Sequence, residues 1–348
     1  MIKYLGSKRL LVGDIVRIIE SLQQADPSIA TVGDLFSGTA RVGQALKRAG
    51  FRVTANDHNT YAATLARCYV EADRETVLSD ATALIREFNA MAGEPGYFTR
   101  TFCEESRFFQ AKNGARVDAI REAIGGLKLD PQLEAVVLVA LMEAADRVDS
   151  TTGVQMAYLK AWAPRSFQDL ELRMPDVLSQ APSGPGHALE LDALDALRAM
   201  DVDVLYLDPP YNQHKYLGNY HIWETLVRWD KPEAYGIARK RVDCRERRSD
   251  FNSKKSIVTA MERIIAEAKC RAMVVSFSNE GYLSREVLEA ILTKRGHVTV
   301  LSYAYKRYVG AQIGVFNPRG EKVGKTSHTG NVENIYVVTP EPWSPPVA

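Results

Sequence analysis

The tetrapeptide Asp208-Pro209-Pro210-Tyr211 combines residue types suited to chemistry on a flat, amine-bearing ligand. It follows an apolar run, residues 202–207, that is interrupted only by Asp203 and is typical of a buried parallel strand. Because each proline fixes φ and lacks an amide hydrogen, we expect the strand to end at the motif. One carboxylate, free carbonyls and an aromatic ring then stand at the carboxyl edge of the sheet, where ligands bind in open α/β folds. A surface turn is the alternative interpretation.

A second unit of the sequence is typical of nucleoside binding. The pattern predicts a strand over residues 31–36, a turn of small residues at 37–40, a helix over 41–48 and a strand over 51–55. Such a turn lets a ligand approach the backbone, and Asp57, just after the second strand, can accept hydrogen bonds from ribose hydroxyls. The turn lacks the two-glycine spacing of a dinucleotide site, which favours a mononucleoside-like cofactor over NAD.

Two further polar features each leave two interpretations open. Residues 3–9 are basic, contain a glycine and lead into a helix that ends before Pro27, so they form either an anion-binding loop or a capped chain terminus. Asp192 follows a predicted strand at residues 188–191 and precedes a predicted helix at 193–200. It either contacts the amino group of a cofactor base or caps that helix.

The order of predicted elements divides the chain into three parts. Strands and helices alternate up to residue 92, the alternation stops where glycines and aromatic residues crowd the sequence, and it returns after a connector at 182–186. We therefore predict a first core part at 1–92, an inserted, mostly helical recognition subdomain at 93–185 and a second core part at 186–348. An extra layer packed on the sheet is the alternative role of the insertion.

Basic residues are concentrated in two segments of the second core part. The segment 231–256 follows the tetrapeptide, which favours a phosphate-binding flap over a solvated loop. A predicted hairpin at 305–330 mixes basic residues with tyrosines, a combination that suits a nucleic-acid backbone. The residues expected to contact nucleic acid are Arg247, Arg248, Lys306 and Arg307.

Composition excludes several classes of protein. The formal net charge is only +1 over 348 residues, so a polyanion must be bound by local patches rather than by the overall field. The four cysteines contain no close pair, so the sequence indicates neither a disulfide framework nor a zinc knuckle, and we expect no metal site and a reducing cytoplasm. We expect no export signal and no membrane span, because no stretch approaches the ~18 continuous apolar residues that a span requires.

Taken together, five elements resemble the Dam-type, alpha-group DNA adenine-N6 methyltransferases, which use S-adenosylmethionine. The resemblance covers the two α/β portions and leaves residues 93–180 unmatched. It implies an α/β, Rossmann-like methyltransferase fold with a mixed, mostly parallel seven-stranded sheet. The elements are, in order, Lys3-Tyr4-Leu5-Gly6-Ser7-Lys8; Asp34-Leu35-Phe36-Ser37-Gly38-Thr39-Ala40 with Asp57; Leu191-Asp192; Asp208-Pro209-Pro210-Tyr211; and Ser276-Phe277-Ser278-Asn279.

Roles for individual residues follow from the resemblance. The catalytic set is Asp208 to Tyr211: Asp208 and the carbonyl of Pro209 accept hydrogen bonds from the target amino group, and Tyr211 stacks on the flipped base, with Phe277 as a second face. Alanine stands at position 40, where the family often has glycine, and we expect it to be tolerated at a helix–strand packing position. The implied cofactor-binding residues are Tyr4, Lys8, Asp34, Phe36, Ser37, Gly38, Thr39, Asp57, Asp192 and Asp208.

The chemistry of an exocyclic amine agrees with this residue set. Its lone pair is delocalised into the ring, and two acceptors at the amine hydrogens favour a pyramidal nitrogen that can attack the methyl group. A cysteine nucleophile is not required. The resemblance implies a site-specific adenine methyltransferase acting on double-stranded DNA, with a cognate restriction endonuclease as a functional partner. Methylation of cytosine N4 or RNA, or a degenerate nucleic-acid-binding relative, are the alternatives, and the oligomeric state stays open.

Overall fold

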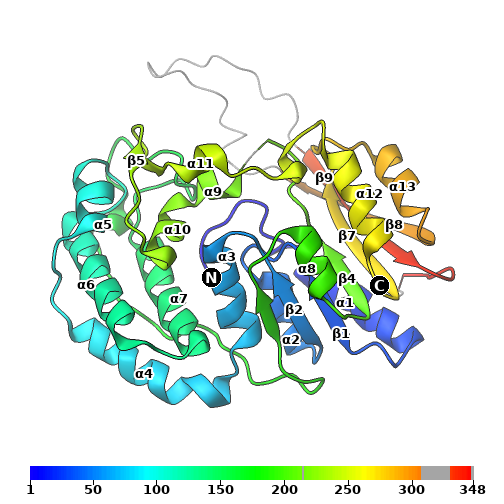
Figure 1. Cartoon of the computed structure of the whole chain (residues 1–348), viewed down its shortest axis with the longest axis horizontal. Coiled ribbons are helices and arrows are strands. Elements are labelled where there is room, and N and C mark those ends of the chain that lie inside the picture. Colours follow the sequence, from blue (N-terminus) through cyan, green and yellow to red (C-terminus); the bar gives the residue numbers. More distant parts are fainter. Residues whose placement is uncertain (214, 307–329, 346–348) are drawn as a thin grey trace.

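The computed structural model describes residues 1–213, 215–306 and 330–345 (Figure 1). A central seven-stranded sheet has the order β3-β2-β1-β4-β7-β9-β8. Every neighbouring pair in it is parallel except those of β9, which runs antiparallel to both β7 and β8. The predicted mixed, mostly parallel seven-stranded sheet is therefore confirmed. Its strands are β1 (Thr31–Asp34), β2 (Arg52–Asn56), β3 (His187–Leu189), β4 (Val204–Leu207), β7 (Ala272–Ser278), β8 (His297–Lys306) and β9 (Gly330–Thr339).

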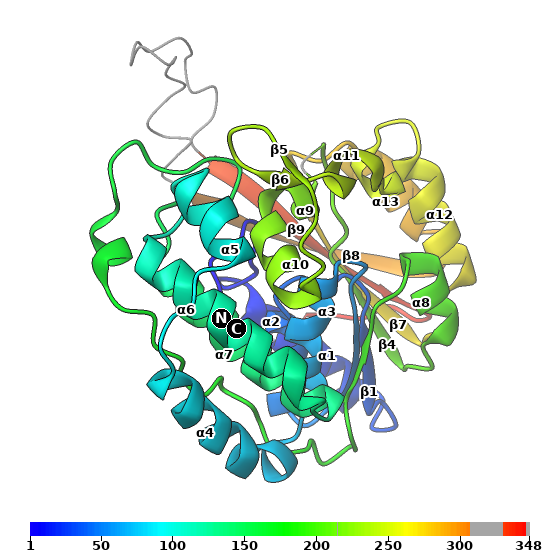
Figure 2. The ribbon, with the colours of Figure 1, turned by 60° about the vertical axis from the view of Figure 1, so that its left-hand side comes forward.

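Helices cover both faces of this sheet (Figures 1 and 2). Two shorter strands, β5 (Ala234–Tyr235) and β6 (Lys240–Arg241), form a separate hairpin. No helix of the described residues is both long enough and apolar enough to cross a lipid bilayer. The helices are α1 (Val12–Ala25), α2 (Arg41–Arg48), α3 (Thr60–Ala66), α4 (Arg74–Ala90), α5 (Tyr97–Thr99), α6 (Ala111–Leu127), α7 (Pro131–Arg147), α8 (Ala193–Ala199), α9 (Tyr216–Asn219), α10 (His221–Arg228), α11 (Asp243–Glu246), α12 (Ile257–Glu267) and α13 (Arg285–Leu292).

Strand β4 shows why the apolar runs of the sequence form central strands. All four of its residues are buried, and they alternate between two hydrophobic cores. Val204 and Tyr206 face the core that contains α1, α2, α3 and α7, whereas Leu205 and Leu207 face the core that contains α8, α12 and α13. A strand covered on both faces needs a continuous apolar sequence. Asp203 interrupts the run because its carboxylate accepts hydrogen bonds from the backbone N–H groups of Ala30 and Thr31, at the start of β1.

The order of the strands creates a topological switch point between β1 and β4. From β1 the chain goes to β2 on one side, and β4 pairs with β1 on the other. In the β1–β4 register, Asp34 lies opposite Tyr206, so Asp208 follows just beyond the same edge. Crevices at such switch points, at the carboxyl ends of the strands, are the usual ligand sites of open α/β sheets. The fold thus brings Asp34, Asp57 and Asp208 to one edge.

The helical insertion packs on one face of the sheet. Helices α4 and α6 both contact α7, and the buried residues of α7 share one hydrophobic core with α3 and β2 (Figure 2). This packing agrees with an extra layer on the sheet. The contact of α4 with α7 also joins residues on both sides of the predicted boundary at residue 92. The division into 1–92, 93–185 and 186–348 stays a prediction.

The basic segment 231–256 has more regular structure than a solvated loop. It contains the β5–β6 hairpin, helix α11 and a 3-10 turn at Asp250–Asn252. The predicted hairpin at 305–330 is different, because residues 307–329 lie outside the described part of the chain. The strands that flank it, β8 and β9, are paired antiparallel from His297–Thr339 to Lys306–Gly330.

Candidate active site

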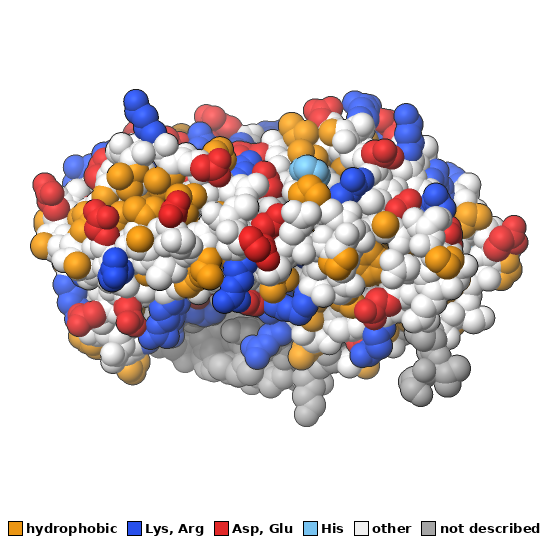
Figure 3. Space-filling view, turned by 90° about the horizontal axis from the view of Figure 1, so that it is seen from below, with side chains coloured by type: hydrophobic (Ala, Val, Ile, Leu, Met, Phe, Trp, Pro, Cys, Tyr) orange, Lys and Arg blue, Asp and Glu red, His pale blue; other side chains and the backbone are white. Residues whose placement is uncertain are grey.

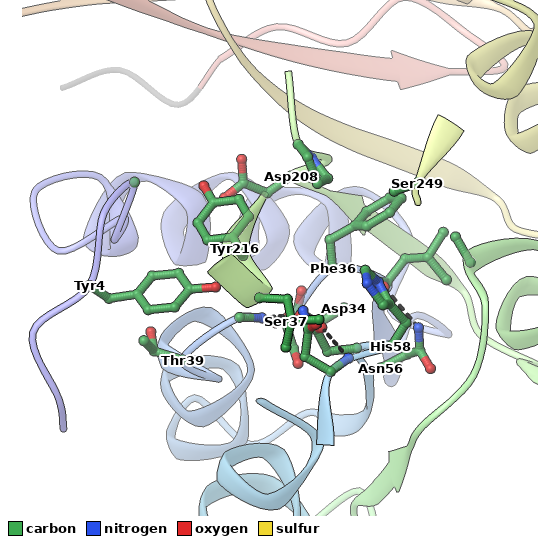
Figure 4. Close-up of a pocket in the computed structure, with 18 of the residues that line it drawn as sticks. Tyr4, Asp34, Phe36, Ser37, Thr39, Asn56, His58, Asp208, Tyr216 and Ser249 are labelled. Atoms are coloured by element: carbon green, nitrogen blue, oxygen red, sulfur yellow. Dashed lines mark hydrogen bonds between the residues drawn. The ribbon is translucent and has the colours of Figure 1, made fainter. Parts of the chain in front are cut away.

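A cavity opens at the carboxyl ends of β1, β2 and β4. Figure 4 shows Tyr4, Tyr216 and Asp208 on one side of it, and Phe36, Asn56 and His58 on the other. Of the residues predicted from the sequence, those that line it are Tyr4, Lys8, Asp34, Phe36, Ser37, Gly38, Thr39, Asp57, Asp208, Pro210, Arg247 and Arg248. Of the predicted residues whose side chains the structure describes, those that are not part of this lining are Pro209, Tyr211, Asp192 and Phe277.

The turn after β1 has the backbone geometry of a ligand-binding loop. Gly38 has φ of +51°, and a Cβ atom at this position would lie 3.3 Å from the ring of Tyr4. Its N–H donates to Oδ2 of Asp57 at 3.1 Å, which ties the turn to the end of β2. Ala40 also lies in the left-handed region, with φ of 58°. Alanine is accommodated here, but its backbone adopts a conformation that glycine adopts more readily.

Acceptors in the cavity wall have few protein partners or none. The hydroxyl of Ser37 and Oδ1 of Asn59 are buried and make no hydrogen bond to any part of the chain that the structure describes, and the buried carboxyl of Asp34 has only the backbone N–H of Gly43 beside it as a donor among those residues. Burial, followed by the nearby charge of Asp208, raises the pKa of Asp34 to about 8. Unpaired buried acceptors are costly, so this wall suits a ligand that brings positive charge or N–H and O–H donors.

The two other predicted acids differ in their surroundings. Asp57 lines the cavity, and its Oδ1 accepts from the backbone N–H of Asn59 at 2.9 Å. Asp192 is exposed and accepts from the N–H of Leu194 at 3.1 Å, as the N-cap of α8. Of the two roles considered for Asp192, the structure supports the helix cap. The end of β3 is instead fixed by the side chain of Asn56, which accepts from the N–H of Leu191 at 3.0 Å and donates to its carbonyl at 3.2 Å.

A stack of three tyrosines forms one wall, and the sequence analysis identified only its middle member. The ring of Tyr4 lies between those of Tyr216 and Tyr220, with centroid distances of 5.2 Å and 4.5 Å and interplanar angles of 9° and 14°. Its hydroxyl is 3.2 Å from that of Tyr61. The N-terminal stretch is held across the site by the N–H of Leu5, which donates to the hydroxyl of Tyr220 at 2.6 Å. Tyr216 and Tyr220 are one helical turn apart, which was the available signal.

The ammonium group of Lys8 is paired with two carboxylates. Its Nζ lies 2.8 Å from Oδ1 of Asp208 and 3.0 Å from Oε1 of Glu333, and only 8% of its side chain is exposed. This arrangement argues against a role for its ammonium group in a free anion-binding loop. Burial raises the pKa of Asp208 to about 6, against the opposing effect of Lys8. Glu333 was not identified from the sequence, although an acid inside an apolar strand pattern is an available signal.

The two predicted base-stacking residues contact each other beside the cavity. The rings of Tyr211 and Phe277 have centroids 6.0 Å apart and an interplanar angle of 63°. The carbonyl of Tyr211 accepts from the N–H of Tyr282 at 2.8 Å, which holds the loop after the motif against the loop after β7. Gly281 permits this packing, because a Cβ atom there would lie 2.3 Å from the ring of Phe277.

The basic residues expected to contact DNA have different surroundings. Arg247 donates to Oε1 of Glu224 at 2.9 Å and to the carbonyl of His58, and Glu224 is fully buried. Arg247 therefore connects the basic segment to α10 and to the loop after β2, whereas Arg248 is exposed at the cavity rim. Arg307 lies outside the described residues, and of Lys306 the structure describes only the backbone, at the end of β8.

Charges on the surface are mixed rather than segregated. On the face drawn in Figure 3, Lys and Arg side chains are interspersed with Asp and Glu, and basic groups are denser toward the lower middle of the view. This distribution agrees with the net charge of +1. A polyanion would therefore be bound by a few local contacts.

Comparison with known proteins identifies this arrangement. Residues 4–291 match the model of the D12 class N6 adenine-specific DNA methyltransferases. The chain is 31% identical over 311 residues to the type II methyltransferase M.FokI of Planomicrobium okeanokoites, which covers 84% of this chain and 47% of that protein. It is 28% identical over 328 residues to the modification methylase StsI of Streptococcus sanguinis, covering 89% and 49%.

A further relative has nearly the same length as the matched region. The chain is 28% identical over 314 residues to the type II methyltransferase M.NlaIII of Neisseria lactamica, covering 88% of this chain and 92% of that protein. The chain thus spans about half the length of M.FokI and StsI, and most of M.NlaIII.

Proposed function

Because the chain belongs to the D12 class N6 adenine-specific DNA methyltransferase family, we propose that it methylates the exocyclic N6 of an adenine in double-stranded DNA, with S-adenosylmethionine as the methyl donor. The observation that carries the proposal is the shared cavity of Asp34 and Asp208 at the β1–β4 switch point. It places a wall of unpaired acceptors next to the acid of the Asp-Pro-Pro-Tyr motif. A target base must leave the duplex to reach such a cavity.

The cavity wall has the donor and acceptor chemistry that this cofactor requires. When bound, S-adenosylmethionine supplies a methyl group on a positively charged sulfur, which leaves as an electrophile. Asp34, a buried carboxyl that no cation of the described residues is paired with, is suited to a cationic group of the cofactor. Asp57 is suited to ribose hydroxyls, and the rings of Phe36 and Tyr216 supply apolar walls on two sides of the cavity (Figure 4).

Asp208 has the surroundings of an acceptor for the target amine. The ion pair with Lys8 involves its Oδ1, so Oδ2 is left to accept a hydrogen bond from the amino group. The carbonyl of Pro209 would accept a hydrogen bond from the second amine hydrogen. The two hydrogen bonds together would hold the nitrogen pyramidal. As nitrogen gains its bond to the methyl carbon it must lose a proton. With a pKa near 6, Asp208 can accept this proton and pass it to solvent.

DNA recognition would come from segments outside the cofactor turn and the Asp-Pro-Pro-Tyr motif. We propose that residues 93–185 contact the recognition sequence and that Arg248, Lys306 and Arg307 contact phosphates, with Tyr211 and Phe277 flanking the flipped base. Relatives named modification methylase and type II methyltransferase support a role in restriction–modification. A cognate restriction endonuclease would then be the functional partner.

Nucleoside analysis tests the proposal directly. Duplex DNA is incubated with the protein and radiolabelled S-adenosylmethionine, digested to nucleosides and separated by chromatography. We expect label in N6-methyladenine. Label in N4-methylcytosine, label only with RNA, or no label with any DNA of mixed sequence would each refute the proposal and would favour the cytosine, RNA or degenerate alternatives in turn.

A variant of the motif separates chemistry from binding. Asp208→Ala removes the acceptor but leaves the turn after β1 intact, so we expect turnover to be lost while the dissociation constant for S-adenosylmethionine changes by no more than a few-fold. Calorimetric titration measures that constant. A large loss of cofactor affinity would contradict the role assigned to Asp208.

A further inference from the structure

Glu333 is buried beside the motif acid although it lies far from it in sequence. It is on β9, opposite Ser278 of β7, and its side chain is 4% exposed. It points to the same face of the sheet as Ile335 and Val337. Residue 333 lies beyond the segment 4–291 that matches the family model, so neither the match nor the motif order assigns it a role.

The contacts of Glu333 connect it to Asp208 through one ammonium group. Its Oε1 lies 3.0 Å from Nζ of Lys8, which is 2.8 Å from Oδ1 of Asp208. The same Oε1 accepts from the hydroxyl of Ser276 at 3.2 Å. Among the described residues, Lys8 is the cation paired with Glu333. These three ionisable groups form what we call the Lys8 bridge: Asp208, Lys8 and Glu333.

The Lys8 bridge carries two carboxylates for one ammonium. Its exposed fractions are 19% for Asp208, 8% for Lys8 and 4% for Glu333, so water screens the charges weakly. If Lys8 were paired with Asp208 alone, the ammonium would neutralise the acceptor. Because Glu333 shares the ammonium from the other side, Asp208 keeps net negative character toward the amine. The other titratable groups that act on these carboxylates are the buried Tyr206, the cavity-lining Tyr216 and Asp34.

We propose that Glu333 is a positioning residue for methyl transfer, which anchors Lys8 so that Asp208 stays oriented toward the target amine and accepts from it more strongly than it would in a closed pair with Lys8. The inference rests on the proposed function. Glu333 is not part of the cavity lining, so it acts through Lys8. Glu333 also raises the pKa of Asp208. The acid limb of the pH–rate profile should therefore depend on Glu333, although this residue lies on β9.

The test measures the single-turnover rate of methyl transfer in preformed complexes from pH 5 to 9, with Glu333→Gln as the variant. The substitution keeps the shape and removes the charge. We expect the rate at the plateau to fall about tenfold and the acid limb of the pH–rate profile to move to lower pH by roughly one unit. Both changes are expected because Asp208 no longer faces the negative charge of Glu333 and becomes the only carboxylate paired with Lys8. Affinities for cofactor and DNA should change less than twofold. Glu289→Gln, on the exposed side of α13, is the matched control and should leave the profile unchanged.

In a Lys8→Met background, the expected effect of Glu333→Gln on the rate has the opposite sign. Lys8→Met leaves Asp208 facing Glu333 without a cation, so its acid limb should move to higher pH. Adding Glu333→Gln to that background should move the limb back and raise the rate, whereas the same substitution lowers the rate in the wild type. Glu333→Asp, which keeps the charge, should hold the limb near its wild-type position. If Glu333→Gln proves unstable, this comparison of Lys8→Met, Glu333→Asp and the double variant still tests the proposal.

The outcomes separate this inference from the proposed function. If the wild type forms no N6-methyladenine, the proposed function fails. If the wild type is active and Glu333→Gln has an unchanged pH profile, with any loss of rate explained by a lower melting temperature, the inference about Glu333 is refuted and the residue has only a packing role.

Discussion

Binding of the cofactor should release a proton from Asp34. With a pKa of about 8, this carboxyl is about nine-tenths protonated at pH 7 in the unliganded protein. A cationic group placed against this buried carboxyl favours its ionised form. Binding of S-adenosylmethionine at pH 7 should therefore release about 0.9 proton from Asp34, and removing that proton costs about 1.4 kcal/mol, or a factor of about ten in affinity.

Calorimetry in different buffers measures this release. The observed binding enthalpy is plotted against the ionisation enthalpy of the buffer, for example phosphate and Tris at pH 7, and the slope is the number of protons released. The amino group of the cofactor itself titrates near this pH. Asp34→Asn corrects for it, because both proteins bind the same ligand. We expect the slopes to differ by about 0.9 proton. Equal slopes would mean that Asp34 is already ionised without ligand, and would refute the reasoning.

The same pKa predicts an effect on stability. The folded protein binds the Asp34 proton more tightly than an unfolded chain does, because the folded pKa of about 8 lies above the ordinary value of 3.8. Stability from this group is fully present below about pH 4 and is lost as the pH rises through 8. Unliganded Asp34→Asn should therefore gain stability relative to the wild type between pH 5 and 9 in urea unfolding. A constant difference over this range would contradict the raised pKa.

Three further predictions concern residues at the rim of the site and beside it. Arg247→Ala leaves the buried carboxylate of Glu224 without its closest cation and should lower the free energy of unfolding by up to about 3 kcal/mol. Arg248→Ala should leave the free energy of unfolding unchanged but weaken DNA binding, and it should reduce the salt slope of that binding by about 1, measured by fluorescence anisotropy at several salt concentrations. If Arg247→Ala instead weakens DNA binding and Arg248→Ala lowers stability, the roles assigned to the two arginines are wrong. Gly281→Ala places a Cβ atom 2.3 Å from the ring of Phe277, so it should destabilise the protein by about 1–3 kcal/mol in urea unfolding. An unchanged unfolding curve would show that the ring can move aside without cost.

The positions of Asp57 and Asp208 could be predicted because they depend on local order. Each follows a predicted strand, and parallel strands bring their carboxyl ends to one edge. Asp34 was expected in the site from the family resemblance alone, inside a strand predicted over residues 31–36, whereas β1 ends at Asp34. The turn after β1 was predictable for the same reason. Its unusual backbone at Ala40 was not, because the left-handed conformation of an alanine has no signal in composition or periodicity.

The remaining features of the site depend on contacts between distant segments. The stack of Tyr4 with Tyr216 and Tyr220 joins the N-terminal stretch to the segment where α9 ends and α10 begins. The spacing of Tyr216 and Tyr220 indicates that these two rings share a helical face, but it does not indicate that Tyr4 packs against them. Arg247 was interpreted as a DNA contact because its segment is basic, whereas its partner Glu224 lies inside an apolar helix. Electrostatic pairing of this kind is a tertiary property, so charge counts along a segment do not reveal it.

The placement of β9 has a consequence for how the site comes into existence during synthesis. Strand β9 lies between β7 and β8, so β8 has no partner in the sheet until β9 has been inserted. Lys8 leaves the ribosome early, Asp208 much later and Glu333 later still. A nascent chain can thus form the cofactor turn while its motif acid has no complete charge environment. Long-range pairings of this sort form slowly. Insertion of β9 between β7 and β8 would therefore come after folding of the cofactor turn, and the site would become competent for methyl transfer only then.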